Sequence, residues 1–267
     1  MKRLIILSVF VALMFFWTIP CSAHFGVVLP SDDIVTQQDP KTIKVDFKFM
    51  HPMEDSYMEL AKPKRVGVIF RGDKTKDLTS QIKSVKFHDG NQQKDFTYWS
   101  LEYKIKRPGD YIFFMEPQPY WEPAEDKFII HYTKACVNAL GMEEGWDARV
   151  NFPIEIVPLV RPYGLWTGNV FRGQVLLNGK PAPFIEVEVE YMNASAEKGK
   201  AVHPPADPFV TQVIKTDANG VFTYAMPKAG WWGFAALADA PWKLKHNNVE
   251  KDVEIGAVFW VHTVDMK

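Results

Sequence analysis

The chain is poor in cysteine and carries no surplus of charge of either sign. Only two of its 267 residues are cysteines, so a framework of several disulfides is excluded. The 31 Lys and Arg residues are balanced by 32 Asp and Glu residues, and no basic block occurs along the chain. This balance argues against nucleic acid as a partner.

The common catalytic motifs are missing as well. The chain contains no GxSxG elbow, no GxxxxGK[ST] phosphate loop, no GxGxxG and no HExxH. Its adjacent carboxylates, Glu125-Asp126 and Glu143-Glu144, would point apart in regular structure, and we expect them in solvated loops. The sequence therefore favours a binding protein over an enzyme.

Long hydrophobic runs are absent except at the N-terminus. There an apolar run, 4–17, follows two basic residues, and Cys21-Ser22-Ala23 places small residues at −3 and −1 of a possible cleavage site. The run is shorter than the ~20 residues that span a bilayer. We expect residues 1–23 to be a signal peptide that is cleaved after Ala23, which predicts an exported protein whose mature chain has no transmembrane helix.

A lipid-modified Cys21 is the alternative reading of this N-terminus. Thr18-Ile19-Pro20 is a poor approach sequence for such a modification. Cleavage after Ala23 would leave Cys136 as the remaining cysteine, in a small apolar setting that is typical of a buried, inert thiol.

What the chain has in abundance is alternation of apolar and polar residues. In TIKVDFKF (42–49) the apolar residues fall on every second position, which is the period of a half-buried strand. Similar runs recur between loops rich in Gly, Pro, Asp and Asn. This pattern predicts an immunoglobulin-like β-sandwich over residues 24–157. In KRPGDYIFFME, Tyr111 resembles the tyrosine that pins a corner of immunoglobulin-like domains.

Two segments in the middle of the chain break this pattern. TKACVNALGMEEGW (133–146) is the one stretch in which we expect a helix. NFPIEIVPLVRPYG (151–164) carries three prolines, which indicates a stiff, extended connector between two domains.

The second half is predicted to be a second β domain, residues 158–267. Asn178-Gly179 marks a hairpin, because both central residues of a type I′ turn need positive φ. The order of Asn-Gly-Lys-Pro, Thr-Asp-Ala-Asn-Gly and Gly-Trp-Trp resembles transthyretin-like domains appended to carboxypeptidases. The predicted fold is thus all-β, with two β-sandwich domains in tandem.

His24 would become the first residue of the mature chain. Its α-amine and imidazole then chelate a divalent metal together, since the amine is partly deprotonated near neutral pH. One further imidazole completes a three-nitrogen histidine brace, a donor set that suits copper, nickel or cobalt. The competing interpretation is a frayed terminal histidine without a fixed partner.

His51 is the best partner for His24. It directly follows the predicted strand 42–50, and Pro52 restricts it to an extended backbone. If the residues after His24 form a strand beside 42–50, both histidines meet at one sheet edge. Glu54 and Asp55 are near enough in sequence to supply an oxygen ligand or to orient an imidazole.

His131 is a third candidate metal ligand, although a structural role on a sandwich face is an equal alternative. We interpret the remaining four histidines as structural or solvated: His88, His203, His246 and His262.

Several motifs, taken in order, extend over nearly the whole mature chain. They are AHFGVVLP, HPMED, PQPYWEPAEDKFIIHYTK, EIVPLVRPYGLWTG, VLLNGKPAPFIEVEVEY and TDANGVFTYAMPKAGWWGF. On these motifs the chain resembles bacterial periplasmic proteins of the nickel uptake transporter family, also described as periplasmic components of ABC-type (energy-coupling factor) cobalt transport. The resemblance implies capture of Ni(II) or Co(II) as cargo for a permease complex at the inner membrane. His24 and His51 match the pattern with most weight.

Two other functions stay open at this level. A copper protein, either a Cu(II) carrier or an oxidative polysaccharide-active enzyme, would use the same brace on a β-sandwich. An oxidative enzyme would need a flat aromatic face, for which the sequence offers Tyr98, Trp99, Tyr120 and Trp121. An adhesion or envelope-interaction module would bind no metal at all.

Overall fold

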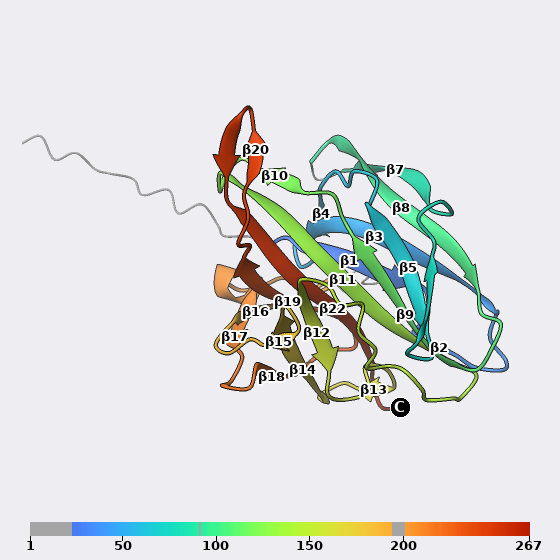
Figure 1. Ribbon diagram of the computed structural model, residues 1–267. Helices are drawn as coiled ribbons and strands as arrows, with labels where there is room; N and C mark the ends of the chain where they lie inside the picture. The colour runs from blue at the N-terminus through green and yellow to red at the C-terminus, as the bar shows by residue number, and fades with distance from the viewer. Residues whose placement is uncertain (1–22, 91, 194–200) are drawn as a thin grey trace, which may run out of the picture.

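The central element of the fold is one long, mixed β-sheet. The structure, a computed structural model, describes residues 23–90, 92–193 and 201–267, so the predicted signal peptide lies outside it except for Ala23. The central sheet runs in the order β17-β16-β19-β22-β11-β9-β5-β6 (Figure 1). Its strands are β5 (Arg65–Phe70), β6 (Lys74–Asp77), β9 (Gly109–Glu116), β11 (Lys127–Ala139), β16 (Glu186–Tyr191), β17 (Gln212–Lys215), β19 (Gly230–Asp239) and β22 (Val253–Val264). Shorter strands pair at its margins: β2 (Ile34–Val35), β10 (Tyr120–Glu122) and β13 (Leu165–Trp166).

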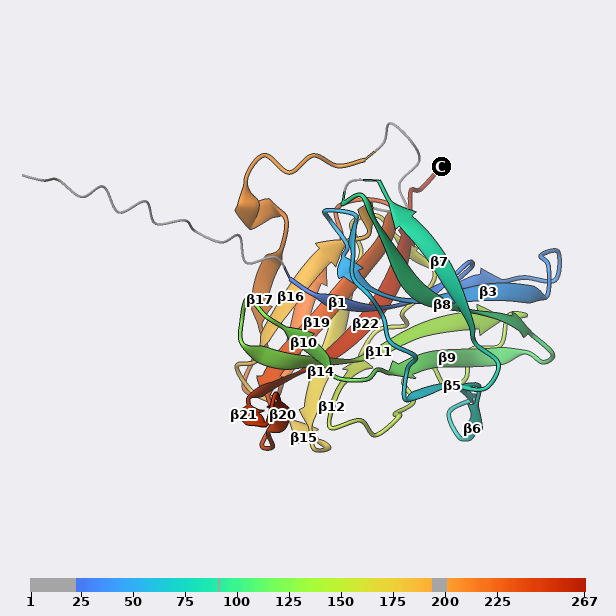
Figure 2. The same cartoon turned by 90° about the horizontal axis from the view of Figure 1, so that it is seen from above.

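Two smaller sheets cover opposite faces of the central sheet (Figure 2). The first has the order β1-β3-β8-β7, with β4 paired to β3. It comprises β1 (Phe25–Pro30), β3 (Thr42–His51), β4 (Ser56–Tyr57), β7 (Lys83–Asp89) and β8 (Lys94–Lys104). The second comprises β12 (Ile154–Pro158), β14 (Val170–Leu177), β15 (Lys180–Pro181) and β18 (Val221–Ala225). A separate hairpin is formed by β20 (Leu244–His246) and β21 (Val249–Lys251).

Each interface between layers holds its own hydrophobic core. Phe47 and Phe113 lie in the core under the first sheet, whereas Phe171 and Phe234 lie in the core under the second. The expectation of an all-β sandwich fold is confirmed. In the described residues there is no α-helix and no helix that could cross a membrane; a short 3-10 turn, η2, spans Asp207–Phe209.

The helix expected at 133–146 is wrong, because β11 continues through Ala139. Residues 133–139 are all buried, since Ala135 faces the first core and Cys136 the second. A central strand that is covered on both faces has no polar alternation, so its apolar run is easily taken for a buried helix. Burial raises the pKa of the Cys136 thiol well above its usual value, as expected for an inert thiol.

Several local predictions are confirmed. The Tyr111 hydroxyl donates to the carbonyl of Arg107 at 2.9 Å, which closes the predicted tyrosine corner. Asn178 and Gly179 both have positive φ and connect β14 to β15 in a two-residue hairpin. The segment 151–164, expected to be an extended connector, is partly a regular strand, because β12 within it pairs with β14.

The central sheet continues across the predicted boundary between residues 157 and 158. β11 from the first half pairs in parallel with β22 from the second half, from Phe128↔Val253 to Ala135↔Trp260. The boundary itself stays a prediction. The two halves share one hydrogen-bonded sheet, so contacts from the second half reach the segment that carries the candidate site.

A buried ion pair also connects β11 to β12. The ammonium of Lys134 lies 2.7 Å from Oε1 of Glu155, and both side chains are about 1–2 % exposed. The Glu155 carboxylate also accepts the N–H groups of Val150 and Asn151. Removing one partner would leave a buried charge without compensation.

We therefore expect Glu155→Gln to lower the free energy of unfolding by about 3–5 kcal/mol, because it leaves the Lys134 ammonium buried and unpaired. The double variant Lys134→Met/Glu155→Gln should lose less than the sum of the two single variants. Urea unfolding followed by circular dichroism measures all three. The exposed pair Lys215–Glu186 is a matched control, for which Glu186→Gln should cost at most about 1 kcal/mol. Equal losses at the two pairs would contradict the prediction.

Candidate metal site

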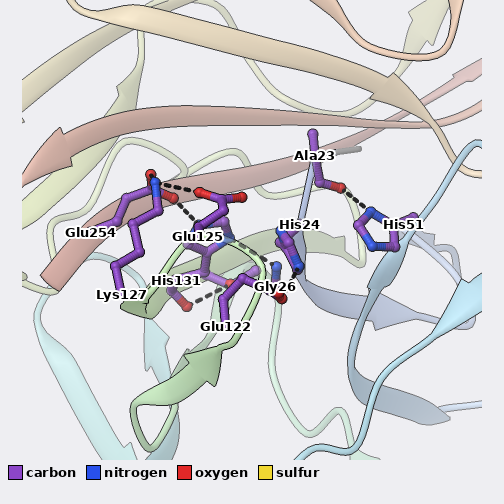
Figure 3. Close-up of polar contacts among 10 residues, drawn as sticks. Ala23, His24, Gly26, His51, Glu122, Glu125, Lys127, His131 and Glu254 are labelled. Atoms are coloured by element: carbon purple, nitrogen blue, oxygen red, sulfur yellow. Dashed lines mark hydrogen bonds and ion pairs between the residues drawn. The ribbon is translucent and has the colours of Figure 1, made fainter. Parts of the chain in front are cut away.

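The register of β1 and β3 brings His24 and His51 together. Phe25 pairs with Met50 in the antiparallel ladder, so the preceding His24 lies beside the following His51. Their ring centroids are 4.6 Å apart. The expectation that the segment after His24 forms a strand beside 42–50, and that the two histidines meet at its edge, is therefore confirmed (Figure 3).

The His24 ring is held by aromatic neighbours and by one carboxylate. It stacks on Phe49, with centroids 5.7 Å apart, and Tyr120 lies 6.3 Å away. Its Nε2 is 2.8 Å from Oε2 of Glu122 on β10. The other oxygen of Glu122 accepts the N–H of Ala124, which fixes the carboxylate in turn.

Burial keeps the His24 ring neutral at physiological pH. Loss of solvent lowers the pKa of His24 to about 4; His51 and His131 nearby also lower it, and Glu122 only partly opposes this. Because the Glu122 carboxylate accepts at Nε2, the ring proton belongs on Nε2. Nδ1 is then the acceptor nitrogen, on the side of the ring that can chelate together with the α-amine. This is the arrangement in which a second residue orients a metal-binding imidazole.

The peptide bond before His24 lies against His51. The carbonyl oxygen of Ala23 is 2.8 Å from Nδ1 of His51, and Ala23 is only 5 % exposed. Within a peptide unit the amide nitrogen is close to the carbonyl oxygen, so the backbone nitrogen of His24 is no more than about 5 Å from Nδ1 of His51. Cleavage after Ala23 would turn that nitrogen into a free amine on His24 itself, no more than about 5 Å from the His51 ring.

Side chains alone do not make a metal site here. Within the described ranges, no group of three or more His, Cys, Asp and Glu side chains is arranged to hold a metal ion. The two imidazoles in ring contact supply two nitrogen donors, one fewer than a histidine brace requires. The α-amine of a mature His24 would supply the third. The residues present therefore fit a metal only if His24 is the first residue.

His131 lies beneath this pair rather than beside it. Its Nδ1 accepts the N–H of Gly26 at 3.3 Å, and its ring packs over Gly256, where any Cβ would approach within 2.5–2.7 Å of ring atoms. Its buried Nε2 is directed toward Glu254, 3.8 Å away, and makes no hydrogen bond to any residue that the structure describes. In this geometry His131 supports β1, and its role as a ligand stays a prediction.

Residues 21–240 match the family described as "Domain of unknown function (DUF4198)". The chain belongs to this family. No curated protein sequence matches it.

The solved structures to which the chain is similar, all at low identity, include the following three. It is 8 % identical to the adhesin InvE of Yersinia pseudotuberculosis, covering 87 % of this chain and 58 % of that one, with a TM-score of 0.21. It is 12 % identical to the D00-D0 domain of Intimin, covering 90 % and 100 %, with a TM-score of 0.20. It is 10 % identical to a protein of Bacteroides uniformis ATCC 8492, provisionally described as carbohydrate-binding, covering 86 % and 96 %, with a TM-score of 0.26.

In this DUF4198 chain, the second half supports the site from two sides. The segment after His51 is tied to β16, because the Met53 N–H donates to Oε2 of Glu190 at 3.0 Å. On the other side, His246 of the β20–β21 hairpin stacks on Trp121 with centroids 3.9 Å apart. Trp121 directly precedes Glu122, so this stack helps to hold in place the carboxylate that orients His24.

Sequence reasoning missed Glu122 as the partner of His24. Because Glu54 and Asp55 follow His51 closely, sequence reasoning chose them to supply an oxygen ligand or to orient an imidazole. Those roles stay predictions. Glu122 is 98 positions away from His24, and only the β10–β11 hairpin returns it to the site. Its one sequence signal was its place in the motif PQPYWEPAEDKFIIHYTK.

The Glu190 carboxyl should make stability depend on pH. Burial raises its pKa from 4.5 to about 8, so the native state binds a proton that the unfolded state releases between these values. Stability should therefore fall as pH rises from about 4.5 to 8, by a few kcal/mol in all, since one pKa unit is worth about 1.4 kcal/mol.

Glu190→Gln isolates this effect, because an amide can still accept from Met53 and donate to Thr211, whose hydroxyl lies 2.5 Å from Oε1. We expect the stability difference between the variant and the wild type to grow in favour of the variant as pH rises from 5 to 8. Urea titrations at closely spaced pH values measure it. A difference that is constant with pH would contradict a proton held by Glu190.

Proposed function

We propose that the chain is a periplasmic metal-binding accessory protein, not an enzyme. It captures Ni(II) or Co(II) as cargo and passes the ion to a permease complex at the inner membrane. The observation that carries the proposal is the meeting of His24 and His51 at the first residue expected after signal cleavage. The signal-like N-terminus and the resemblance of the motifs to those of nickel and cobalt uptake proteins support the cellular context.

The donor set suits reversible capture. Three nitrogens, one of them a terminal amine, bind late first-row metals well but do not enclose the ion as a thiolate cage does. The buried neutral ring of His24 needs to lose no proton before binding. Only the amine competes with protons near neutral pH.

A copper protein is the second candidate, and Tyr120 is the observation that favours it. Its ring lies beside both His24 and Phe49, where a phenol could approach a bound ion. A polysaccharide oxidase would also need a flat aromatic face. Trp121, the residue after Tyr120, does not contribute to one here, because its ring packs against His246 and Phe128. Copper carriage is therefore the more consistent form of this alternative.

The free amine of His24 gives the first test. Two forms are compared, one starting at His24 and one retaining Ala23, by calorimetric titration with Ni(II), Co(II) and Cu(II). Retaining Ala23 should weaken binding of each metal at least ~100-fold, since the amine leaves the chelate and one of three nitrogens is lost. Thermal unfolding of both apo forms is the control for folding. Equal affinities would rule out the brace.

His51 gives the second test. His51→Ala in the form starting at His24 should lose most of the metal affinity and keep the thermal midpoint of the apo protein, because His51 lies at a strand end and is only partly buried. His88→Ala is the matched control, as His88 is exposed and paired with Asp95. Unfolding of apo His51→Ala, or equal loss of metal in both variants, would assign His51 a structural role.

In vitro affinity cannot identify the cargo, because any such site binds Cu(II) more tightly than Ni(II) or Co(II). Native mass spectrometry of protein purified from the periplasm of its own host answers this point. A nickel or cobalt adduct supports uptake, and a copper adduct supports the second candidate.

A further inference from the structure

A basic cleft lies away from the metal site, where the first sheet and the central sheet diverge. It has a volume of about 520 Å³, which is within the range of ligand pockets. β6 at the edge of the central sheet forms one wall, and the end of β8 with the loop after it forms the other. Its cationic lining residues are Lys74, Lys76, Lys104, Lys106 and Arg107.

The charge of this cleft is not balanced locally. Glu102 is the one carboxylate in its lining, although the chain as a whole has a net charge of −1. Among the residues that the structure describes, none of the five cations forms an ion pair with an acidic side chain. Five unpaired cations around one hollow focus a positive potential into it.

Edge protection explains only part of this arrangement. Lysines on an edge strand such as β6 prevent pairing with other chains, which accounts for Lys74 and Lys76. It does not account for Lys104, Lys106 and Arg107, which come from the opposite wall. Their convergence from a second sheet indicates a site for an anion.

The floor of the cleft is aromatic. Phe70 and Tyr103 are partly buried in its lining, and Tyr111 lies beneath them. The ammonium of Lys76 is 5.8 Å from the Tyr103 ring centroid, and that of Lys74 is 6.0 Å from the Phe70 centroid. Thr75 and Gln81 add neutral hydrogen-bonding groups to the walls. A bare inorganic anion would use the cations and could accept hydrogen bonds from the neutral groups, but it would leave the aromatic floor unused.

A second hollow of about 380 Å³ adjoins the first and shares Gln81 and Glu102 with it. It adds Lys83 to the basic lining, together with Lys44, whose ammonium is paired with Asp46 at 3.0 Å. The two hollows together are longer than one small anion, and their cations are spaced along the surface. This shape suits an extended ligand with several anionic groups.

We propose that this cleft binds an acidic oligosaccharide, with its carboxylate or phosphate groups on the lysines and a sugar ring on Tyr103. The apolar face of a sugar ring packs on an aromatic side chain, and its hydroxyls pair with neutral polar groups such as Gln81. Nucleic acid fits less well, because the balanced charge of the chain offers no basic surface beyond the cleft to hold a long polyanion. The proposal is independent of the metal site.

Calorimetric titration of the form starting at His24 with trigalacturonate, maltotriose and tripolyphosphate tests it. Trigalacturonate should bind, and maltotriose should bind at least ~10-fold more weakly because it lacks charge. Lys104→Glu/Lys106→Glu should weaken trigalacturonate at least ~10-fold. The control Lys180→Glu/Lys245→Glu makes the same change of net charge on exposed residues of the second half, and should have less than about a twofold effect.

Tyr103→Leu separates sugar recognition from simple anion binding. It should weaken trigalacturonate and leave tripolyphosphate unchanged, with thermal unfolding as the check that the cleft is intact. Absence of trigalacturonate binding, equal effects of the two lysine pairs, or equal binding of maltotriose would overturn the proposal. Tighter binding of tripolyphosphate than of trigalacturonate, insensitive to Tyr103→Leu, would assign the cleft to bare anions instead.

Discussion

The close contact of β1 with β11 at Gly26 is the constraint on which the candidate site depends. A Cβ at this position would lie 2.3 Å from Oγ1 of Thr133, so only glycine allows the two strands to approach. The Gly26 N–H donates to Nδ1 of His131, and its carbonyl accepts the indole N–H of Trp260 at 2.9 Å. Both partners are buried on central strands.

These two hydrogen bonds of Gly26 form a clamp on β1. His24 is two residues before this clamp, so its backbone is fixed although it would stand at the mature terminus. A terminal histidine is ordinarily frayed; here the strand that follows it is anchored from both sides.

The clamp also explains why the two halves of the chain depend on each other. Trp260 belongs to β22 and His131 to β11, and these strands form the parallel ladder at the centre of the sheet. Glu190 and His246 reach the site from the second half as well, behind His51 and Glu122 respectively. The second half of the chain thus contributes to the orientation of individual site residues as well as to the central sheet. Separating the chain at residue 157 would therefore remove half of the supports of the site.

Sequence patterns predicted what is local and missed what depends on distant pairing. Alternation in residues 42–49 identified β3, and the position of His51 after it was enough to place two histidines at one edge. The turn chemistry of Asn178-Gly179 was equally local. The stretch 133–139 was misread because its burial on both faces comes from two other sheets, neither of which can be seen in its own sequence. Glu122 was missed for the same reason, since its contact with His24 depends on a hairpin pairing about a hundred positions away.

On the proposed function, signal cleavage does more than release the protein. Before cleavage the Ala23 carbonyl faces His51, and the nitrogen of His24 is an amide, which is a poor ligand because its lone pair is delocalised into the peptide bond. Two imidazoles without the amine fall short of a three-donor site. After cleavage the same nitrogen becomes a basic amine within reach of both rings. Ala23 is only 5 % exposed in the folded protein, so a cleavage after it would precede docking of β1. On the proposed function, export, cleavage and folding would then occur in that order, and the site would form with the amine already present as its third donor.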